Sequence, residues 1–219
     1  YAQSLYEKKL LTYPRTDSRY LTSDMAETAS CVIHLAAKVP PFDGCSSFFP
    51  LVELMFSDKD VSDHHAIIPT MEIEKADMKA LPVGERNLLL LVCCRLLCAS
   101  ASPYEYETAT ATFDCGGHTF TAKGRRILAE GWREIESIFR SSLKEKPEDT
   151  ESGGVLPDFT EGQTFEKVEA TITEHFTSPP KPYTEDTLLS AMENAGKEDI
   201  PEDAERKGLG TPATRAAII

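Results

Sequence analysis

The segment 88–98 is apolar on nearly every side and carries a single charge, Arg95. A helix that is hydrophobic all round has to be buried among other elements. It cannot cross a membrane, because spanning a bilayer takes roughly 18 or more consecutive apolar residues. Since 41% of the chain is hydrophobic, enough apolar surface is available to pack a core around it. We therefore expect a soluble, globular chain whose buried helix is closed by Ser102 and Pro103.

Further helices are expected on both sides of this buried one. Leucines over residues 1–11 have helical spacing, and the helix has to end before Pro14, because a residue that precedes proline avoids the α region. A second helix is expected over residues 22–38, where the Pro40-Pro41 pair stops it. Near the end of the chain, Thr184 fits the N-cap of another helix.

The pattern changes to a β type after Pro103. Threonines and aromatic residues alternate on both sides of Gly116-Gly117, which predicts a β-hairpin. Apolar and polar residues also alternate over 164–175, so we expect another strand there, after an exposed loop over 141–162. The expected class is α+β. It has three regions: a mostly helical region 1–102, a β-rich region 103–182 and the start of a further helical region 183–219.

The net charge of −13 argues against general electrostatic attraction to nucleic acid. The acidic residues are concentrated in 145–161 and 198–205, however, whereas 8–19 is net basic and 123–126 holds three cations. Local basic patches therefore remain available to a phosphate backbone.

The cysteine pattern indicates a reduced protein. None of the six cysteines forms a Cys-x-x-Cys pair, and three lie in the apolar run 88–98. We expect buried thiols and a reduced, cytosolic setting, and we expect no bound zinc.

Residues 11–18 contain the densest group of reactive side chains. Tyr13 is a candidate nucleophile toward phosphorus, because a phenol whose pKa is near 10 can be activated by cationic neighbours. Arg15, two residues away in an extended segment, points to the same side and can neutralise charge on a phosphate. The alternative is an ordinary Tyr-Pro turn on the surface, capped by Asp17.

Two other groups complete the candidate site. His64 and His65 lie in a pre-proline segment; they lack the further ligands of a zinc site, and a cationic histidine can hold a phosphate beside a tyrosine. The alternative is a pair of partly exposed loop histidines. In residues 206–215, two glycines precede Thr211-Pro212, which suits an anion-binding helix start. A capped helix start without any ligand fits this segment equally well.

In this order the three groups resemble the type IA DNA topoisomerases, and more closely the topoisomerase III branch than the bacterial topoisomerase I branch. The resemblance covers the whole chain. The residues that carry it are Tyr13-Pro14-Arg15-Thr16-Asp17-Ser18, the His-His-Ala-Ile-Ile-Pro-Thr stretch 64–70, the Gly-Leu-Gly-Thr-Pro-Ala-Thr-Arg stretch 208–215, Lys123-Gly124-Arg125, Glu130-Gly131-Trp132, and the approach from Pro179-Pro180 to Met192.

The resemblance implies roles for individual positions. Tyr13 would attack a phosphodiester of single-stranded DNA and hold its 5′ phosphate, Arg15 would steady that phosphate, and His64 would lie close to the same site. Topoisomerase I relatives carry an arginine at the position of Thr211, so Arg215 is a nearby candidate for anion binding. The DNA-binding residues implied are Thr12, Thr16, Ser18, His65, Thr211, Thr214 and Arg215.

The resemblance also implies what lies outside the chain. We expect an internal piece of a longer enzyme, with the Mg²⁺ ligands and the acid for the leaving oxygen on a preceding Toprim domain. Without that domain the piece should be inactive. The complete enzyme would pass a second strand through the cut and reseal it without ATP, with no small-molecule cofactor and no membrane contact. It would act in the cytoplasm of a bacterial-type cell, associated with the nucleoid, with a helicase or another DNA-processing protein as candidate partner.

A rival hypothesis is a non-catalytic nucleic-acid-binding or scaffold fragment in which Tyr13 is merely packed. The acidic balance favours it, whereas the series of motifs argues against it. Burial separates the two hypotheses: a phenol enclosed by apolar side chains supports the rival, and a phenol facing a groove together with Arg15 and His64 supports the enzyme.

Overall fold

The computed structural model describes residues 1–44, 50–61, 63–143, 154–196, 208–211, 214, 215 and 218. The chain divides into two compact units, Tyr1–Thr160 and Glu161–Ile219. The described residues combine helices with a two-stranded antiparallel sheet. The predicted mixture of α and β structure is therefore present.

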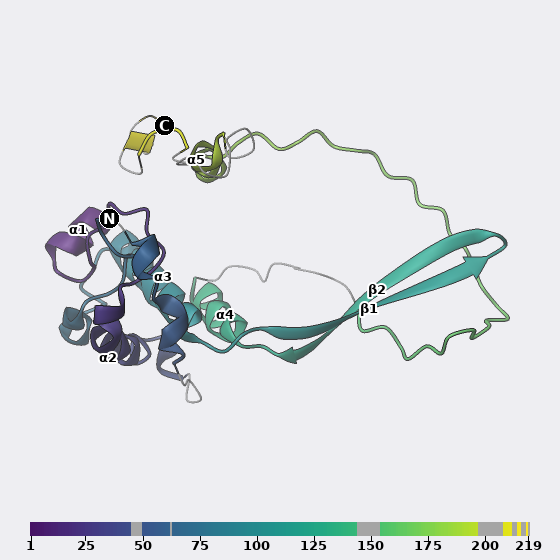
Figure 1. Cartoon of the computed structure of the whole chain (residues 1–219), viewed down its shortest axis with the longest axis horizontal. Helices are drawn as coiled ribbons and strands as arrows, with labels where there is room; N and C mark the ends of the chain where they lie inside the picture. The colour runs from purple at the N-terminus through teal and green to yellow at the C-terminus, as the bar shows by residue number, and fades with distance from the viewer. Residues whose placement is uncertain are drawn as a thin grey trace. The chain divides into compact units, whose positions relative to one another are not determined.

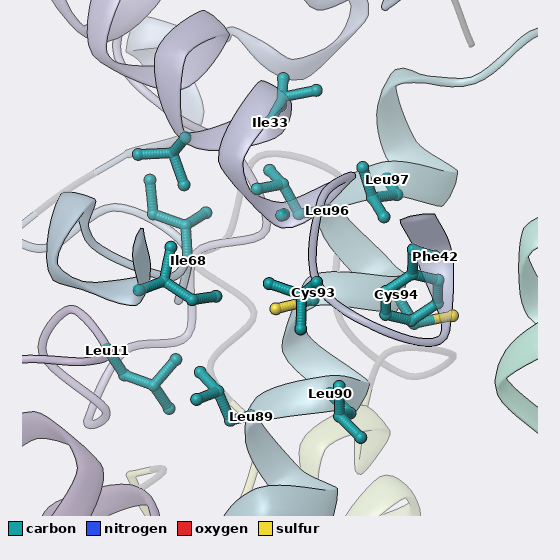
Figure 2. Packing of buried hydrophobic residues seen from close by; sticks show 14 of the residues in the cluster. Leu11, Ile33, Phe42, Ile68, Leu89, Leu90, Cys93, Cys94, Leu96 and Leu97 are labelled. Carbon is teal, nitrogen blue, oxygen red and sulfur yellow. The ribbon is translucent and has the colours of Figure 1, made fainter. Parts of the chain in front are cut away.

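Helix α3, Val83–Ser100, is the centre of the first unit. It begins five residues before the apolar run and ends next to the predicted Ser102-Pro103 stop. Leu89, Cys93 and Leu97 are almost completely buried, and Figure 2 shows them among other apolar side chains. The expectation of a buried helix here is confirmed.

Shorter helical elements pack around α3. The helices over Ala26–Ala36 and Trp132–Ser142, together with several 3₁₀ segments, bring apolar side chains such as Ile33, Phe42 and Phe139 into the same core. In the described part of the chain, no helix is long and apolar enough to cross a membrane. In chain order these elements, of which Figure 1 labels the α-helices, are α1 (Ala2–Glu7), η1 (Ser23–Met25), α2 (Ala26–Ala36), η2 (Phe42–Gly44), η3 (Val52–Met55), η4 (Asp58–Asp60), η5 (Met71–Lys75) and α4 (Trp132–Ser142).

The predicted hairpin is confirmed as strands β1, Glu105–Cys115, and β2, His118–Ala129. Gly116 and Gly117 have φ angles of 61° and 81°, which side-chain-bearing residues rarely adopt and which a tight two-residue turn requires. Figure 1 shows the two strands side by side as a twisted ribbon. Their antiparallel register pairs Thr112 with Thr121 and Phe113 with Phe120.

The hairpin is fixed at its base and covered on part of one face. A Cβ added to Gly131 would lie 2.2 Å from the carbonyl oxygen of Pro103, so only glycine lets the two ends of the hairpin meet this closely. Further along, residues 154–160 cross the strands: Leu156 fills the space beside Gly124, and the rings of Phe159 and Phe113 meet edge to face at 5.4 Å.

The second unit contains one well-formed helix, α5, Glu185–Asn194. Thr184 caps it as predicted and exchanges hydrogen bonds with Thr187 in a capping box. The strand expected over 164–175 is absent from the structure, where these residues are exposed and irregular. A strand needs a partner for its backbone hydrogen bonds, and no other described segment pairs with this one.

The expectation of buried thiols is right for only some of the described cysteines. Cys93 and Cys94 are buried in α3, and Cys98 is half-buried. Cys31, on α2, and Cys115, beside the hairpin turn, are exposed. Cys45 lies outside the described residues.

A buried carboxylate ties α1 to the start of α3. Glu85 is 7% exposed and accepts hydrogen bonds from the Lys8 ammonium and, at 3.0 Å, from the Ser4 hydroxyl. The hydrogen bond from Lys8 holds the pKa of the Glu85 carboxyl below its usual value near 4.5. A carboxylate in the first turn is also favoured by the helix dipole.

We predict that Glu85→Gln lowers the free energy of unfolding near pH 7. A carboxyl whose pKa is lowered by folding stabilises the folded state above its unfolded pKa, and this contribution is lost as pH falls through the folded pKa. The difference between wild type and variant should therefore shrink below about pH 4.5 and vanish once Glu85 is protonated in the folded protein. Urea titrations at several pH values from about 7 downward measure this difference in the free energy of unfolding.

Glu72→Gln serves as the control, because Glu72 pairs with Lys75 on the surface at 3.3 Å and both side chains are at least half exposed. An equal pH-dependent loss in both variants would contradict a special role for the Glu85 contacts.

Candidate active site

Two irregular segments, 10–21 and 56–70, pair along their length and form the candidate site. Leu11 and Pro69 make an antiparallel bridge. Thr12 exchanges two hydrogen bonds with Ile68: its amide donates to the Ile68 carbonyl and its hydroxyl accepts from the Ile68 amide, each at 3.0 Å. Leu11 and Ile68 are buried and join the core beside Leu89, so the pairing is anchored in the interior (Figure 2).

The pairing continues past Tyr13 to the histidines. The Thr16 hydroxyl donates to the His64 carbonyl at 2.9 Å, and the Ser18 hydroxyl lies 3.2 Å from the carbonyl oxygen of Asp60. The Ala66 amide donates to the Tyr20 carbonyl at 2.9 Å. These contacts bring His64 next to Tyr13 although the sequence separates them by about fifty residues.

Tyr13 lies between two rings. The His64 ring centroid is 4.4 Å from that of Tyr13, and Tyr6 meets Tyr13 edge to face at 5.5 Å. The phenol is half-buried, and within the described residues its hydroxyl has no hydrogen-bond partner. The expected approach of His64 to Tyr13 is therefore found. The phenol is not enclosed by apolar side chains, as the rival hypothesis requires.

Arg15 is placed differently from His64. Its side chain is exposed, and it makes no ion pair or ring contact with any residue that the structure describes. Convergence of Arg15 on Tyr13 therefore stays a prediction. The neighbouring Lys9 and Arg19 are also exposed, and so is Lys8, which pairs with Glu85.

Hydroxyls that were expected to face DNA are used by the chain itself. Thr12 and Thr16 join the two segments, and Ser18 bonds to the backbone around Tyr20. The Nδ1 atom of His65 lies 2.7 Å from the Ala66 carbonyl oxygen, so this nitrogen carries the proton, because a carbonyl can only accept. These contacts give the four residues a part in shaping the site. Their contact with DNA stays a prediction.

The third motif is a folded loop within the second unit. Gly208 packs against the end of α5, where an added Cβ would lie 2.4 Å from the Glu193 carbonyl oxygen. Thr211 and Thr214 exchange hydrogen bonds as a cap does, which fits the predicted helix start. Arg215 is 8% exposed, and its guanidinium donates to the carbonyls of Leu209 and Gly210 at 2.8 and 3.0 Å. In this conformation Arg215 holds the loop in place.

Tyr6 and the contacts that position it have no signal in the sequence. Tyr6 belongs to α1, whose place is fixed by the bonds from Ser4 and Lys8 to Glu85. Its spacing of seven residues from Tyr13 carries no signal of contact, because the chain turns between them at Lys9, where φ is 60°.

Comparisons with known proteins agree on one family. A family model described as DNA topoisomerase matches residues 1–219. The chain is 37% identical to DNA topoisomerase 3 of Bacillus licheniformis and of Bacillus subtilis (strain 168), and 36% identical to that of Staphylococcus aureus (strain MRSA252). Each alignment covers 99% of this chain but only 30–31% of the relative, so the chain spans about a third of the length of these proteins.

We predict that Thr16→Val loosens the pairing of the two segments. The variant keeps the shape of the side chain but loses the bond to the His64 carbonyl and the one that the Ser18 amide makes to the Thr16 hydroxyl. Loss of such a bond costs about 1 kcal/mol. Hydrogen exchange should become faster at Ser18, and Thr16→Ser should restore it.

Thr110→Val is the matched control, because Thr110 is exposed on β1. Unchanged exchange at Ser18 in Thr16→Val would show that the hydroxyl does not hold the segment.

Proposed function

The chain belongs to the DNA topoisomerase family, and from that premise we propose that it carries the strand-cutting tyrosine, Tyr13, of a type IA enzyme of the topoisomerase III kind. The chain spans about a third of its relatives, so the activity is proposed for the complete protein. The observation that carries the proposal is the half-buried Tyr13, whose ring lies against Tyr6 and His64 and whose hydroxyl lacks a partner in the described part of the chain.

In the proposed reaction the Tyr13 oxygen attacks the phosphorus of one phosphodiester in a single strand. A bond forms between Tyr13 and phosphorus while the bond to the 3′ oxygen breaks, and the 5′ end stays attached to the protein. The phenolic proton leaves to a base, and the 3′ oxygen takes up a proton. Resealing is the reverse step, so the bond energy is conserved in the phosphotyrosine and no ATP is needed.

The geometry supports this step through positioning. Phosphoryl transfer depends mainly on holding the groups in line and stabilising charge. Tyr6 and His64 restrict the ring of Tyr13, and a protonated His64 adds a positive charge beside the phosphate. Arg15 and Lys9 supply exposed cations for the strand, and Arg15 has the planar fork that suits a phosphate.

Magnesium belongs to this proposal only through residues outside the chain. In the described part of the chain, no three His, Cys, Asp or Glu side chains gather where they could hold a metal ion. We assign the Mg²⁺ ligands and the acid for the 3′ oxygen to the preceding Toprim domain that the resemblance implies. The isolated chain should accordingly be unable to cut DNA.

The cellular setting is proposed on the same basis. The relatives named above come from bacteria. We propose that the complete protein acts on single-stranded regions of the bacterial chromosome, in the cytoplasm, with a helicase or another DNA-processing protein as its partner. Thr211 and Thr214 are proposed to contact DNA from the second unit, with Arg215 supporting their loop.

We predict that Tyr13→Phe in the complete enzyme abolishes the covalent complex while single-strand binding stays nearly intact. The change removes only the nucleophile, and neighbouring Ser or Thr hydroxyls are less acidic and placed differently. Binding depends on many modest phosphate and stacking contacts, and phenylalanine keeps the ring. Trapping cut DNA under denaturing conditions detects the 5′ adduct.

Tyr20→Phe is the matched control and should form the adduct, because Tyr20 is exposed on the same segment. A 5′ adduct that persists in Tyr13→Phe would defeat the central proposal.

We also predict that Arg15→Ala slows cleavage by roughly a hundredfold, as expected for loss of one donor to the transition state. The cleavage rate of Arg15→Lys should lie between those of the wild type and Arg15→Ala, because lysine keeps the positive charge but lacks the planar fork of arginine. Single-turnover cleavage rates at saturating DNA measure the effect. Lys38→Ala, at an exposed cation beside the end of α2, is the control, and an equal loss in both alanine variants would point to general charge attraction instead.

A further inference from the structure

Two cysteines on α3 lie one helical turn apart and touch. The Sγ atoms of Cys94 and Cys98 are 3.9 Å apart, within reach of a thiol–thiol hydrogen bond. Cys94 is buried and Cys98 is half-buried, so Cys98 is the more accessible member of the pair. The proposed DNA reaction uses neither thiol.

The other cysteines on the described segments do not join this pair. Cys93 follows a different direction around the helix from Cys94, as Figure 2 shows, because adjacent helical residues do not face each other. Burial raises the pKa of the Cys93 thiol to about 12, which leaves it unreactive. Cys31 and Cys115 are exposed on α2 and β1.

The spacing of the pair disfavours a disulfide. Helical residues four apart have Cβ atoms roughly 5–6 Å apart, whereas a disulfide needs about 3.5–4.5 Å. Oxidation would therefore distort α3. A single bridging atom needs a smaller change than a disulfide, because two sulfurs bound to one atom at about 2.3 Å, the Zn–S length, are roughly 3.4–3.8 Å apart for bond angles from about 95° to tetrahedral.

The number of ligands then selects the kind of bridging atom. In the described part of the chain no third Cys, His, Asp or Glu joins the two thiols, so the four-ligand shell of zinc is not available. Trivalent arsenic with one carbon substituent needs two thiols and no more. We propose that Cys94 and Cys98 form a chelating dithiol site for monosubstituted arsenic(III) compounds, such as methylarsonous acid.

The binding step is a ligand exchange without oxidation or reduction. Two As–O bonds break and two As–S bonds form, and the two thiol protons leave with the two hydroxides as water. Contact with Cys98 lowers the pKa of the Cys94 thiol, so Cys94 is the more readily ionised member of the pair. Once one sulfur is bound, the second bond forms within the molecule and benefits from a high effective concentration.

Occupancy of the site has a structural consequence at the base of the hairpin. The Cys98 thiol donates to the carbonyl of Trp132 at 3.5 Å, and Trp132 is the first residue of α4. Loss of the thiol proton removes this bond between α3 and α4. The salt bridge between Arg95 and Glu136, 3.1 Å long, remains to hold the two helices together.

The test exposes the reduced, folded, full-length protein to methylarsonous acid and locates arsenic by intact mass and peptide mapping. Within the peptides of this chain we expect one methylarsenic group, bridging Cys94 and Cys98, and protection of both thiols from iodoacetamide. Cys98→Ser and Cys94→Ser should each weaken binding by roughly a hundredfold or more, because only one thiol remains. Cys31→Ser should bind as the wild type does.

Circular dichroism and thermal melting check that each variant is folded. Cys98→Ser carries the test if Cys94→Ser does not fold, because Cys98 is the less buried residue. Undiminished binding by folded Cys98→Ser, arsenic on other cysteines, or no uptake by the folded wild type would each overturn the proposal.

Discussion

The paired hydrogen bonds between Thr12 and Ile68 hold together two segments that are far apart in sequence. Closing a loop of more than fifty residues has an entropic cost that grows slowly with length. Burial of Leu11 and Ile68 against α3 offsets this cost, since each buried side chain of this size contributes about 1.5–3 kcal/mol. Together with the bond from Thr16 to the His64 carbonyl, this pairing brings His64 to Tyr13.

The site combines irregular backbone with a rigid support. Tyr13 and His64 lie on stretches of irregular backbone, while α3, which packs against the same segments, is a long, buried helix. Glu85 extends that support to α1, and α1 carries Tyr6 to the ring of Tyr13. Loops positioned by a scaffold are a common place for catalytic groups. Here the support reaches the ring of Tyr13 from both sides, through α1 and through the segment that carries His64.

The same helix connects the site to the hairpin. The end of α3 leads into β1, and Gly131 lets the end of β2 return to the Pro103 carbonyl before α4 packs back on α3. Cys94 and Cys98 belong to this junction, because Cys98 bonds to the first residue of α4. A ligand at the dithiol would therefore act on the base of the hairpin, whereas changes at Glu85 act on the tyrosine.

The sequence by itself determined the elements whose signals are local. The apolar run around Leu89, the Gly116-Gly117 turn and the Thr184 cap each depend on neighbouring residues, and the order of the motifs was enough to indicate the family. Tertiary structure decided which residues far apart in the sequence come into contact, because contacts across fifty or more residues depend on packing that the spacing of residues does not predict. In the folded chain, residues 164–175 have no strand partner among the described segments, and Cys31 and Cys115 are exposed. Arg215 is buried against its own loop, and the rings of Tyr6 and His64 lie against Tyr13.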